Sequence, residues 1–339
     1  MKKYVSILLV LFVFNSFAQI PTGYYDSANG LTGQELKIAL YNIIKNHTTY
    51  PYTSSSTDVW DILKETDRDP NNPENVIFLY TGWSVNAAQE YNDGAGWSRE
   101  HVWAKSHGDF DEIPPAGTDT HHLRPEDISV NSARGDKDFD NGGTQHAEAT
   151  ECYTDADSWE PRPAVKGDVA RMMFYMATRY QGENGEPDLE LVDYTGTDGP
   201  IFGKLSTLLA WNEEDPVDDF ERNRNEVVYS YQHNRNPFID HPEFVKDIYY
   251  PDEDTTSTTG TYILADDNSI KIFPNPVSTT LYVDAPDYCS VEIYSVIGEK
   301  LLDTKQKQIN IGQFETGVYF ILVKNEKGIG IKSEKISKY

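Results

Sequence analysis

The residues best suited to chemistry lie between positions 97 and 134 of the sequence. A carboxylate and an imidazole are adjacent there (Glu100, His101), a histidine pair follows (His121–His122), and Asn131 completes the set. Histidine titrates near neutral pH, so its imidazole can take a proton from water. A carboxylate and an amide oxygen are hard ligands that suit Mg²⁺. Hydrolysis of a phosphodiester needs both a base and a cation, so Glu100, His101 and Asn131 are candidates for that chemistry.

Two local structures are expected to position these groups. Residues 100–103 are aromatic or β-branched for the most part, which favours a strand. A proline opens the segment 125–134, which favours a helix there. Because successive side chains of a strand point to opposite faces, Glu100 and His101 would lie on opposite faces. Asn131 would then come from the helix packed beside that strand.

The rest of the first 250 residues predicts a mainly helical body around this stretch. Thr32 and Glu35 have the spacing of a capping box, which predicts the start of a helix. A later helix carries methionines at core spacing, with Arg171 and Arg179 off that apolar stripe. The expected elements are helices over 32–47, 57–66, 166–180 and 205–211, a turn over 67–75 and a buried strand over 76–80.

The charge of the chain bears on its partners. The net charge is −26 over 339 residues, and 12% of the residues are aromatic, which indicates a globular protein and not a disordered acidic chain. This charge repels nucleic acid at long range, so local cations would have to offset it. Arg222, Arg224 and Arg235 lie in one segment, and two readings stay open for them: contact with a phosphate backbone, or internal salt bridges.

The N-terminus has the pattern of a secretory signal. Two lysines precede an apolar run over 5–14, and small residues end the pattern at Ala18. The run is short for a membrane span, so a membrane anchor is the weaker reading and no span is expected after cleavage. Exported proteins often carry disulfides, but the only two cysteines, Cys152 and Cys289, fall in different expected domains and we do not pair them.

A change of composition divides the exported chain. Residues 252–261 (DEDTTSTTGT) are acidic, rich in threonine and without apolar residues, as in a linker. Beyond them, short alternating runs separated by turn residues predict a small all-β, Ig-like sandwich. The expected division is a signal peptide at 1–18, a catalytic domain at 19–251, a linker at 252–269 and the sandwich at 270–339.

Three runs of the sequence resemble the bacterial endonuclease I family of extracellular and periplasmic nucleases. They are SREHVWAKS (98–106), DTHHLRPEDISVNSARGD (119–136) and KGDVARMMFYMATRY (166–180). The resemblance implies an α+β fold, with a mostly helical nuclease domain around a ββα-metal (His-Me) finger. It also implies that His101 activates the water and that Glu100 and Asn131 bind the metal. Arg134 follows the motif asparagine and is implied as a contact to phosphate.

The chain also departs from this family. The family's run reads aspartate-leucine-histidine-asparagine-leucine, and His121 matches its histidine, for which a supporting, hydrogen-bonding role is implied. Where some members carry a further glutamate, this chain has Gly117 and Thr118, so no second acidic site residue is carried over. No counterpart is evident for the upstream arginine that binds phosphate in some relatives. Characterised periplasmic members hold several disulfides, which two cysteines cannot form.

The tail resembles a second family, the type IX secretion sorting domain. The marks are FPNP at 273–276, Gly298, the run GVYFI at 317–321, and the basic residues Lys335 and Lys338 near the end. The resemblance implies that the type IX secretion machinery is a partner. The expected location is therefore outside the cell or on its surface, reached through the periplasm.

These features together predict a secreted, non-specific endonuclease that cuts DNA, with RNA as a second substrate, and leaves 5′-phosphates. Mg²⁺ is the expected cofactor, with Mn²⁺ or Ca²⁺ as alternatives, and a monomer is the expected state. One alternative is a secreted binding or adhesive protein whose finger is structural. Another is a different hydrolase, such as a phosphomonoesterase.

Overall fold

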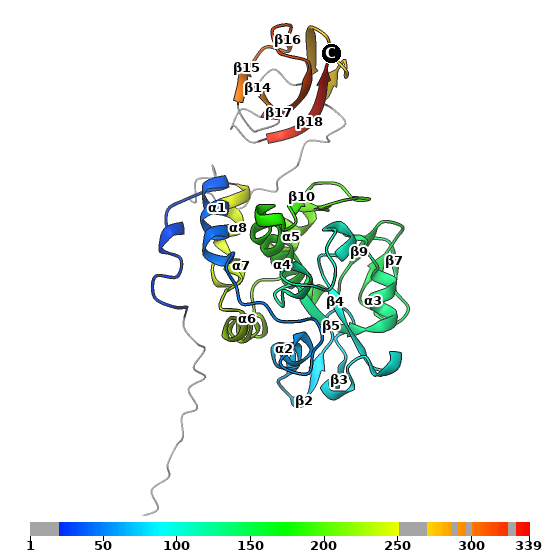
Figure 1. Cartoon of the computed structure of the whole chain (residues 1–339). Coiled ribbons are helices and arrows are strands. Elements are labelled where there is room, and N and C mark those ends of the chain that lie inside the picture. Colours follow the sequence, from blue (N-terminus) through cyan, green and yellow to red (C-terminus); the bar gives the residue numbers. More distant parts are fainter. Residues whose placement is uncertain (1–19, 251–269, 286–289, 296–299, 325–329) are drawn as a thin grey trace, which may run out of the picture. The chain divides into compact units, whose positions relative to one another are not determined.

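The computed structural model describes residues 20–250, 270–285, 290–295, 300–324 and 330–339. Its contacts divide the chain into two compact units, Met1–Tyr249 and Tyr250–Tyr339 (Figure 1). The predicted signal peptide, the linker and Cys289 lie outside the described residues. Within the described part, no helix has the length and apolar character that a membrane span requires.

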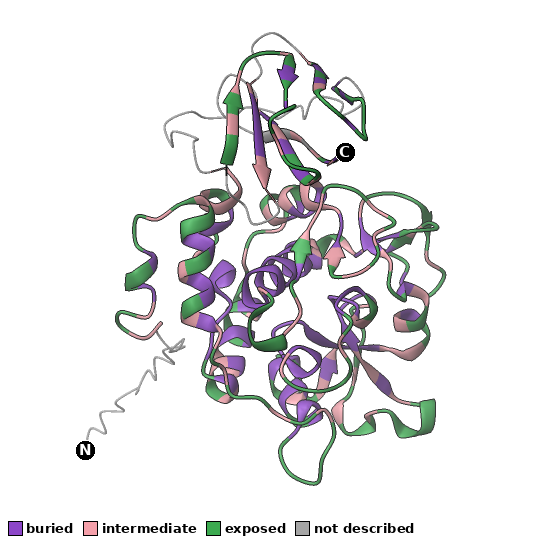
Figure 2. Ribbon diagram, turned by 45° about the horizontal axis from the view of Figure 1, so that its top comes forward, coloured by how far each residue is buried: buried purple, intermediate pink, exposed green. Residues whose placement is uncertain are grey.

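Helix α4 (Lys166–Arg179) is the centre of the first unit. It is buried along almost its whole length, and Figure 2 shows it purple at the middle of the body. The first unit is mainly helical, as predicted. Its other helices are α1 (Gly33–Ile44), α2 (Val59–Thr66), α3 (Ile128–Arg134), α5 (Leu205–Glu214), α6 (Asp219–Gln232), α7 (Pro237–Asp240) and α8 (Glu243–Tyr249).

The sequence placed Arg171 and Arg179 off the apolar stripe of α4, but the structure buries both side chains. Arg171 is 1% exposed and Arg179 is 2% exposed. A buried guanidinium is tolerated when a carboxylate compensates its charge. Arg171 pairs with Glu221 of α6 at 2.5 Å, and Arg179 pairs with Glu186 at 2.6 Å. These partners are distant in sequence or outside the helix, so helical periodicity alone did not reveal them.

Helices α1 and α2 lie where the sequence predicted helices, but the N-terminal cap expected for α1 is absent. Asp58 caps α2, since its carboxylate accepts from the backbone N–H groups of Trp60 and Asp61. Thr32 precedes α1 but its side chain makes no capping hydrogen bond. The helix is instead fixed by its apolar face, because Leu36 and Leu40 are fully buried.

The predicted turn over 67–75 is replaced in part by strands. Strand β1 (Arg68–Asp69) pairs antiparallel with β2 (Asn72–Ile77), and β2 pairs with β3 (Ser84–Asn86). The strand predicted over 76–80 is therefore shifted toward the N-terminus and ends at Ile77. The turn residues were correctly placed only at the tight connection between β1 and β2, since a hairpin uses the same residue types.

A hairpin and a helix hold the central stretch. Strand β4 (Trp97–His101) pairs antiparallel with β5 (Leu123–Asp127), and α3 follows directly and contacts both strands (Figure 1). The prediction that the helix begins at Pro125 was wrong, because that proline lies inside β5. The start is set by Asp127, whose carboxylate accepts from the N–H groups of Ser129 and Val130.

Short strands complete the first unit, and the second unit is all-β, as predicted. In the second unit one sheet has the order β12-β13-β16 and the other β15-β14-β17-β18, and residues of both sheets share one apolar core. An Ig-like type for this pair of sheets stays a prediction. The remaining strands are β6 (Asp138–Phe139), β7 (Thr144–Gln145), β8 (Tyr153–Thr154), β9 (Ser158–Glu160), β10 (Glu190–Leu191), β11 (Ile201–Phe202), β12 (Lys271–Phe273), β13 (Thr280–Asp284), β14 (Ser290–Ser295), β15 (Lys300–Thr304), β16 (Gln308–Asn310), β17 (Gly317–Lys324) and β18 (Gly330–Lys338).

Candidate active site

A cavity of about 810 Å³ opens beside strand β4 and helix α3. Glu100, His101 and Asn131 all line it, so the structure brings the three sequence-predicted residues to one place. Its remaining wall is aromatic and charged and consists of Tyr52, Thr53, Trp60, Tyr91, Ser98, Arg99, Ala104, Lys105, Ser106, Glu112, Gly135 and Asp136.

His101 is held in one tautomer. Its Nε2 lies 3.0 Å from the carbonyl oxygen of Gly117, and a carbonyl can only accept, so Nε2 carries the proton. Nδ1 is then the basic nitrogen. Burial lowers the pKa of His101 well below its ordinary value, with a smaller effect from His122, so the ring is neutral near pH 7. A neutral imidazole with a free lone pair can accept a proton from water.

The position of Gly117 explains why this loop can reach His101. Gly117 is buried in the short turn before Asp119, and a Cβ added to it would lie 1.7 Å from the carbonyl oxygen of Asp111. The backbone at position 117 therefore lies closer to the backbone of Asp111 than any residue with a side chain would allow. This role could not be found from the sequence, because a backbone carbonyl group is present at every position.

Replacing Gly117 by alanine is expected to displace this loop. The added methyl group has to move away from the Asp111 carbonyl, and the Gly117 carbonyl then loses its alignment with His101 Nε2. We expect kcat to fall at least about tenfold, because small misplacements of catalytic groups are costly. The free energy of unfolding should also fall by about 1–3 kcal/mol, which lowers the melting temperature. Steady-state kinetics and thermal unfolding measure the two effects, and an unchanged kcat would contradict the role of the carbonyl.

Glu100 is a buried carboxylate, and only one of its two oxygens contacts polar groups among the described residues. Its Oε1 accepts from the hydroxyl of Tyr80 at 2.7 Å and lies 3.1 Å from Nη1 of Arg134. Its Oε2 has no hydrogen-bond partner among the residues that the structure describes. Burial raises the pKa of Glu100, while the charge of Arg134 and the hydrogen bond from Tyr80 oppose that rise.

The predicted contact of Arg134 with phosphate does not fit the structure. Arg134 is 0% exposed and does not line the cavity. Its guanidinium donates to the carbonyl oxygens of His101 at 3.0 Å and Val102 at 2.7 Å, besides its ion pair with Glu100. Arg134 thus holds the end of β4 and the Glu100 carboxylate from behind. The reason is local: as the last residue of α3 it points into the hairpin on which the helix packs.

Asn131 offers one free oxygen to the same cavity. Its Nδ2 donates to Ser98 Oγ at 3.0 Å, which fixes the amide, and its Oδ1 has no hydrogen-bond partner in the described part of the chain. Glu100 Oε2 and Asn131 Oδ1 are the donor types that a hard divalent cation prefers. No group of three or more His, Cys, Asp or Glu side chains is placed to hold a metal within the described residues. The donor set thus fits a cation that keeps several waters.

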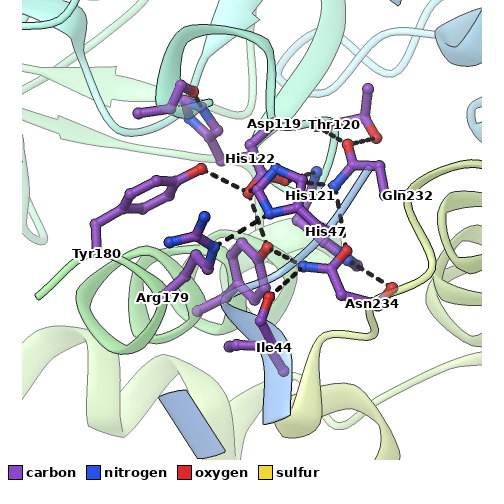
Figure 3. A network of polar contacts seen from close by, with 12 residues as sticks. Ile44, His47, Asp119, Thr120, His121, His122, Arg179, Tyr180, Gln232 and Asn234 are labelled. Carbon is purple, nitrogen blue, oxygen red and sulfur yellow. Dashed lines mark hydrogen bonds and ion pairs between the residues drawn. The ribbon is translucent and has the colours of Figure 1, made fainter. Parts of the chain in front are cut away.

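His121 and His122 do not line the cavity, and their hydrogen bonds hold the loop in place. His121 Nε2 donates to the carbonyl of Asn234 at 3.2 Å, and His122 Nε2 donates to the carbonyl of Ala116 at 2.9 Å. Figure 3 shows His121 inside a network of polar contacts that joins the loop to α4 and to the chain after α6. The supporting role expected for His121 agrees with these contacts.

Asp119 is the centre of this network. Its Oδ2 accepts from the hydroxyls of Tyr175 at 2.8 Å and Tyr180 at 2.9 Å, and its Oδ1 accepts from Gln232 at 3.0 Å (Figure 3). Burial alone would raise the pKa of Asp119, but hydrogen bonds and neighbouring histidines lower it overall. His47 lies 3.9 Å away, but burial lowers its pKa too, so near pH 7 this is a neutral ring beside a carboxylate. Two separate elements therefore anchor the loop that carries Gly117.

For three arginines the sequence left open a choice between phosphate contact and internal salt bridges, and the structure separates them. Arg224 is 2% exposed and lies 3.4 Å from Asp67 through Nε, and Arg235 pairs with Asp240 at 2.5 Å. The reading of internal salt bridges is correct for these two. Arg222 is at the surface, pairs with the neighbouring Asp219 at 3.1 Å, and does not line the cavity.

Comparisons with known proteins identify the families to which the two units are similar. Residues 32–243 match the family model described as Endonuclease I, and residues 271–337 match that of a secretion system C-terminal sorting domain. The chain is 59% identical over 228 residues to the extracellular ribonuclease of Bacillus subtilis (strain 168) and 57% identical over 228 residues to that of Bacillus amyloliquefaciens. Each of these alignments covers 67% of this chain and 78% of the relative.

A relative with lower sequence identity is named a deoxyribonuclease. The chain is 30% identical over 144 residues to the extracellular deoxyribonuclease of Aeromonas hydrophila, which covers 40% of this chain and 55% of the relative. The match to the first family model spans more than half of the chain, and the site residues lie inside it. The protein is therefore a secreted or cell-surface nuclease that belongs to the endonuclease I family and carries a C-terminal type IX secretion sorting domain.

Proposed function

We propose that this nuclease is a metal-dependent endonuclease that hydrolyses phosphodiester bonds of DNA and RNA. One observation carries the proposal. His101 is a neutral imidazole that lines the same cavity as one oxygen of Glu100 and one of Asn131. Its basic nitrogen and these two oxygens have no hydrogen-bond partner among the residues that the structure describes. A base and a hard-cation site in one cavity are the two requirements of this hydrolysis.

In the proposed mechanism each residue has a single task. His101 Nδ1 takes the proton from the attacking water, while the Gly117 carbonyl keeps Nε2 protonated and then stabilises the imidazolium that forms. Glu100 and Asn131 would hold Mg²⁺, with Mn²⁺ or Ca²⁺ as alternatives. When bound, the cation supplies positive charge that stabilises the leaving 3′ oxygen. Departure of that oxygen leaves the phosphate on the 5′ end of the downstream product.

The local fold supports the same proposal. Two antiparallel strands followed directly by a helix, with the base on the first strand and one ligand on the helix, are the parts of a ββα-metal finger. Strand alternation places Glu100 and His101 on opposite sides of β4. The His101 base and the Glu100 carboxylate would then act from opposite sides of the scissile phosphate, as in-line displacement requires.

The choice of substrate follows from the mechanism and from the relatives. No step uses a 2′-hydroxyl, so the mechanism does not distinguish ribose from deoxyribose. Two relatives are named ribonucleases and one is named a deoxyribonuclease. We infer that the enzyme cuts both nucleic acids, acts as a monomer, and leaves the cell through the type IX machinery recognised by its sorting domain.

Removal of metal tests this function. We expect the full chain to convert supercoiled plasmid to nicked and linear forms, and to degrade a structureless RNA, in Mg²⁺. EDTA should lower both rates at least about tenfold, since the cation contributes several kcal/mol to the transition state. Excess Mg²⁺ should restore them. Gel electrophoresis and 5′-end analysis of the products provide the readout. Cleavage that is insensitive to EDTA would contradict metal dependence, and release of phosphate alone would indicate a phosphomonoesterase.

A further inference from the structure

The charge of the first unit poses a question about substrate binding. The whole chain carries a net charge of −26, and a nucleic acid is itself a polyanion. Most arginines of the unit cannot offset this repulsion, because they are already paired with carboxylates and buried. Arg124, Arg171, Arg179, Arg224 and Arg235 all form such ion pairs.

Arg99 is different from these arginines. It lines the catalytic cavity, it is partly exposed, and it forms no ion pair with a carboxylate among the described residues. Arg68 and Arg162 also have no carboxylate partner in the described part of the chain, but neither lines the cavity. The other cation of the wall, Lys105, is already neutralised by Glu112 at 2.7 Å. An uncompensated guanidinium beside the catalytic residues of an acidic protein is available to an anion.

Aromatic rings hold the Arg99 guanidinium in place. Its central carbon lies 3.3 Å from the ring centroid of Tyr52 and 4.0 Å from that of Trp60. Its Nη1 donates to the carbonyl of Tyr52, and its Nη2 donates to Thr53 Oγ1 at 3.1 Å. These neutral partners fix the orientation without cancelling the charge. The group has five N–H donors, so further donors are left on its two terminal nitrogens.

Burial makes the charge of Arg99 more effective. The guanidinium is partly removed from water and has no ion pair in the described part of the chain, which costs solvation free energy. An anion bound there would remove that penalty. The interaction would also be stronger than at the open surface, because fewer waters screen it.

The place of Arg99 in strand β4 indicates which part of the substrate it meets. Alternation puts Arg99 on the same side of the strand as His101, and Ser98 and Glu100 on the other. The ring of Tyr52 confirms this neighbourhood, since it stacks on His101 with centroids 5.7 Å apart and also contacts Arg99. Arg99 thus belongs to the side of the cavity from which water would attack.

We propose that Arg99, held between Tyr52 and Trp60, binds a phosphate oxygen of the nucleic-acid backbone on the His101 side of the cavity. This assignment rests on the proposed function. It gives the acidic enzyme a local cation for its polyanionic substrate, and it takes the place of the phosphate contact first expected of Arg134. Arg99 is therefore a substrate-binding residue, not a proton carrier.

The test measures binding without cleavage. A fluorescein-labelled single-stranded oligonucleotide is titrated with the full-length protein in EDTA at several salt concentrations, and anisotropy gives Kd. Arg99→Gln is expected to weaken binding at least about tenfold, the effect of one lost charged hydrogen bond. The slope of log Kd against log salt should fall by about 0.7, the value for one phosphate contact to a single strand. In Mg²⁺ the same variant should raise KM more than it lowers kcat.

Arg222→Gln is the matched control, because it removes the same charge from the surface of α6 away from the cavity. We expect its Kd to stay within about twofold of the parent, since a remote surface charge acts weakly through salt. Circular dichroism checks that Arg99→Gln folds. If it does not, Arg99→Lys carries the test, and a Kd at least about threefold weaker than the parent is expected, because an ammonium lacks the planar fork.

The outcomes separate the two proposals. If the parent cleaves nucleic acid in Mg²⁺ and Arg99→Gln binds with the Kd and salt slope of the parent, the Arg99 assignment is wrong and the proposed function stands. The same conclusion follows if a folded Arg99→Lys, tested in its place, binds like the parent. If the parent itself does not cleave either nucleic acid in Mg²⁺, the proposed function is wrong.

Discussion

Replacing His101 by asparagine is expected to lower kcat for cleavage of DNA and RNA by about 10²- to 10⁴-fold, the usual contribution of a positioned general base. Asparagine has a similar size and an amide N–H that can still donate to the Gly117 carbonyl. It cannot take a proton from water near pH 7. KM should change much less than kcat, because substrate binding is assigned to other groups. Initial rates with fluorescent DNA and RNA in Mg²⁺ measure the effect.

His233→Asn is the control for this experiment, because it makes the same substitution at an exposed histidine. His233 ends helix α6 with φ of 62°, a left-handed conformation that asparagine tolerates better than most residues. Its rates are expected to match the parent. A His101→Asn rate within tenfold of the parent would rule out His101 as the base.

The sequence predicted those parts of the fold that depend on local patterns. Apolar residues at helical spacing located α1, α2 and α4, because such a face can be satisfied only by packing against a core. Alternating runs located the strands of the second unit for a similar reason. The errors arose where the secondary structure of a segment depends on pairing with a segment distant in the sequence. Pro125 marks a helix start by its own chemistry, but the pairing of β5 with β4 places it in a strand.

The same distinction applies to the site. That Glu100, His101 and Asn131 lie together could be predicted, since their side-chain types and motif positions indicate one chemistry. Their roles in that chemistry stay predictions. The role of Arg134 could not be predicted, because an arginine that holds carbonyls from behind has the same sequence signature as one that meets phosphate. Arg99 lies inside the run 98–106, but only the structure shows that it lines the cavity and has no carboxylate partner among the described residues.

The buried polar network has a consequence for stability in acid. His121 and His122 are at most 1% exposed, and burial lowers the pKa of each to about 4 against the pull of Asp119. In the unfolded chain these rings titrate near 6.5. Between about pH 6.5 and pH 4 the unfolded state therefore binds more protons than the folded state. Stability is full above pH 6.5 and is lost as the pH falls toward 4.

We expect the free energy of unfolding of the parent to fall by several kcal/mol between pH 7 and pH 5, with each of these two histidines contributing on the order of 2 kcal/mol. His122 is the better ring to remove, since its Nδ1 is buried without a hydrogen-bond partner in the described part of the chain. Its place in the motif run is that of the family's asparagine. His122→Asn should therefore keep the fold and lose about 2 kcal/mol less than the parent over this interval.

Guanidinium unfolding at pH 7, 6 and 5, followed by tryptophan fluorescence, measures this difference. All six tryptophans precede residue 212, so the signal reports on the nuclease unit and not on the sorting domain. His233→Asn again serves as the control and should follow the parent curve, because its ring is exposed. If His122→Asn lost as much stability as the parent between pH 7 and 5, protonation of His122 would not be part of acid unfolding. Loss of stability would then come from protonation of another group, with His121 the first to examine, because burial lowers its pKa to about 4 as well.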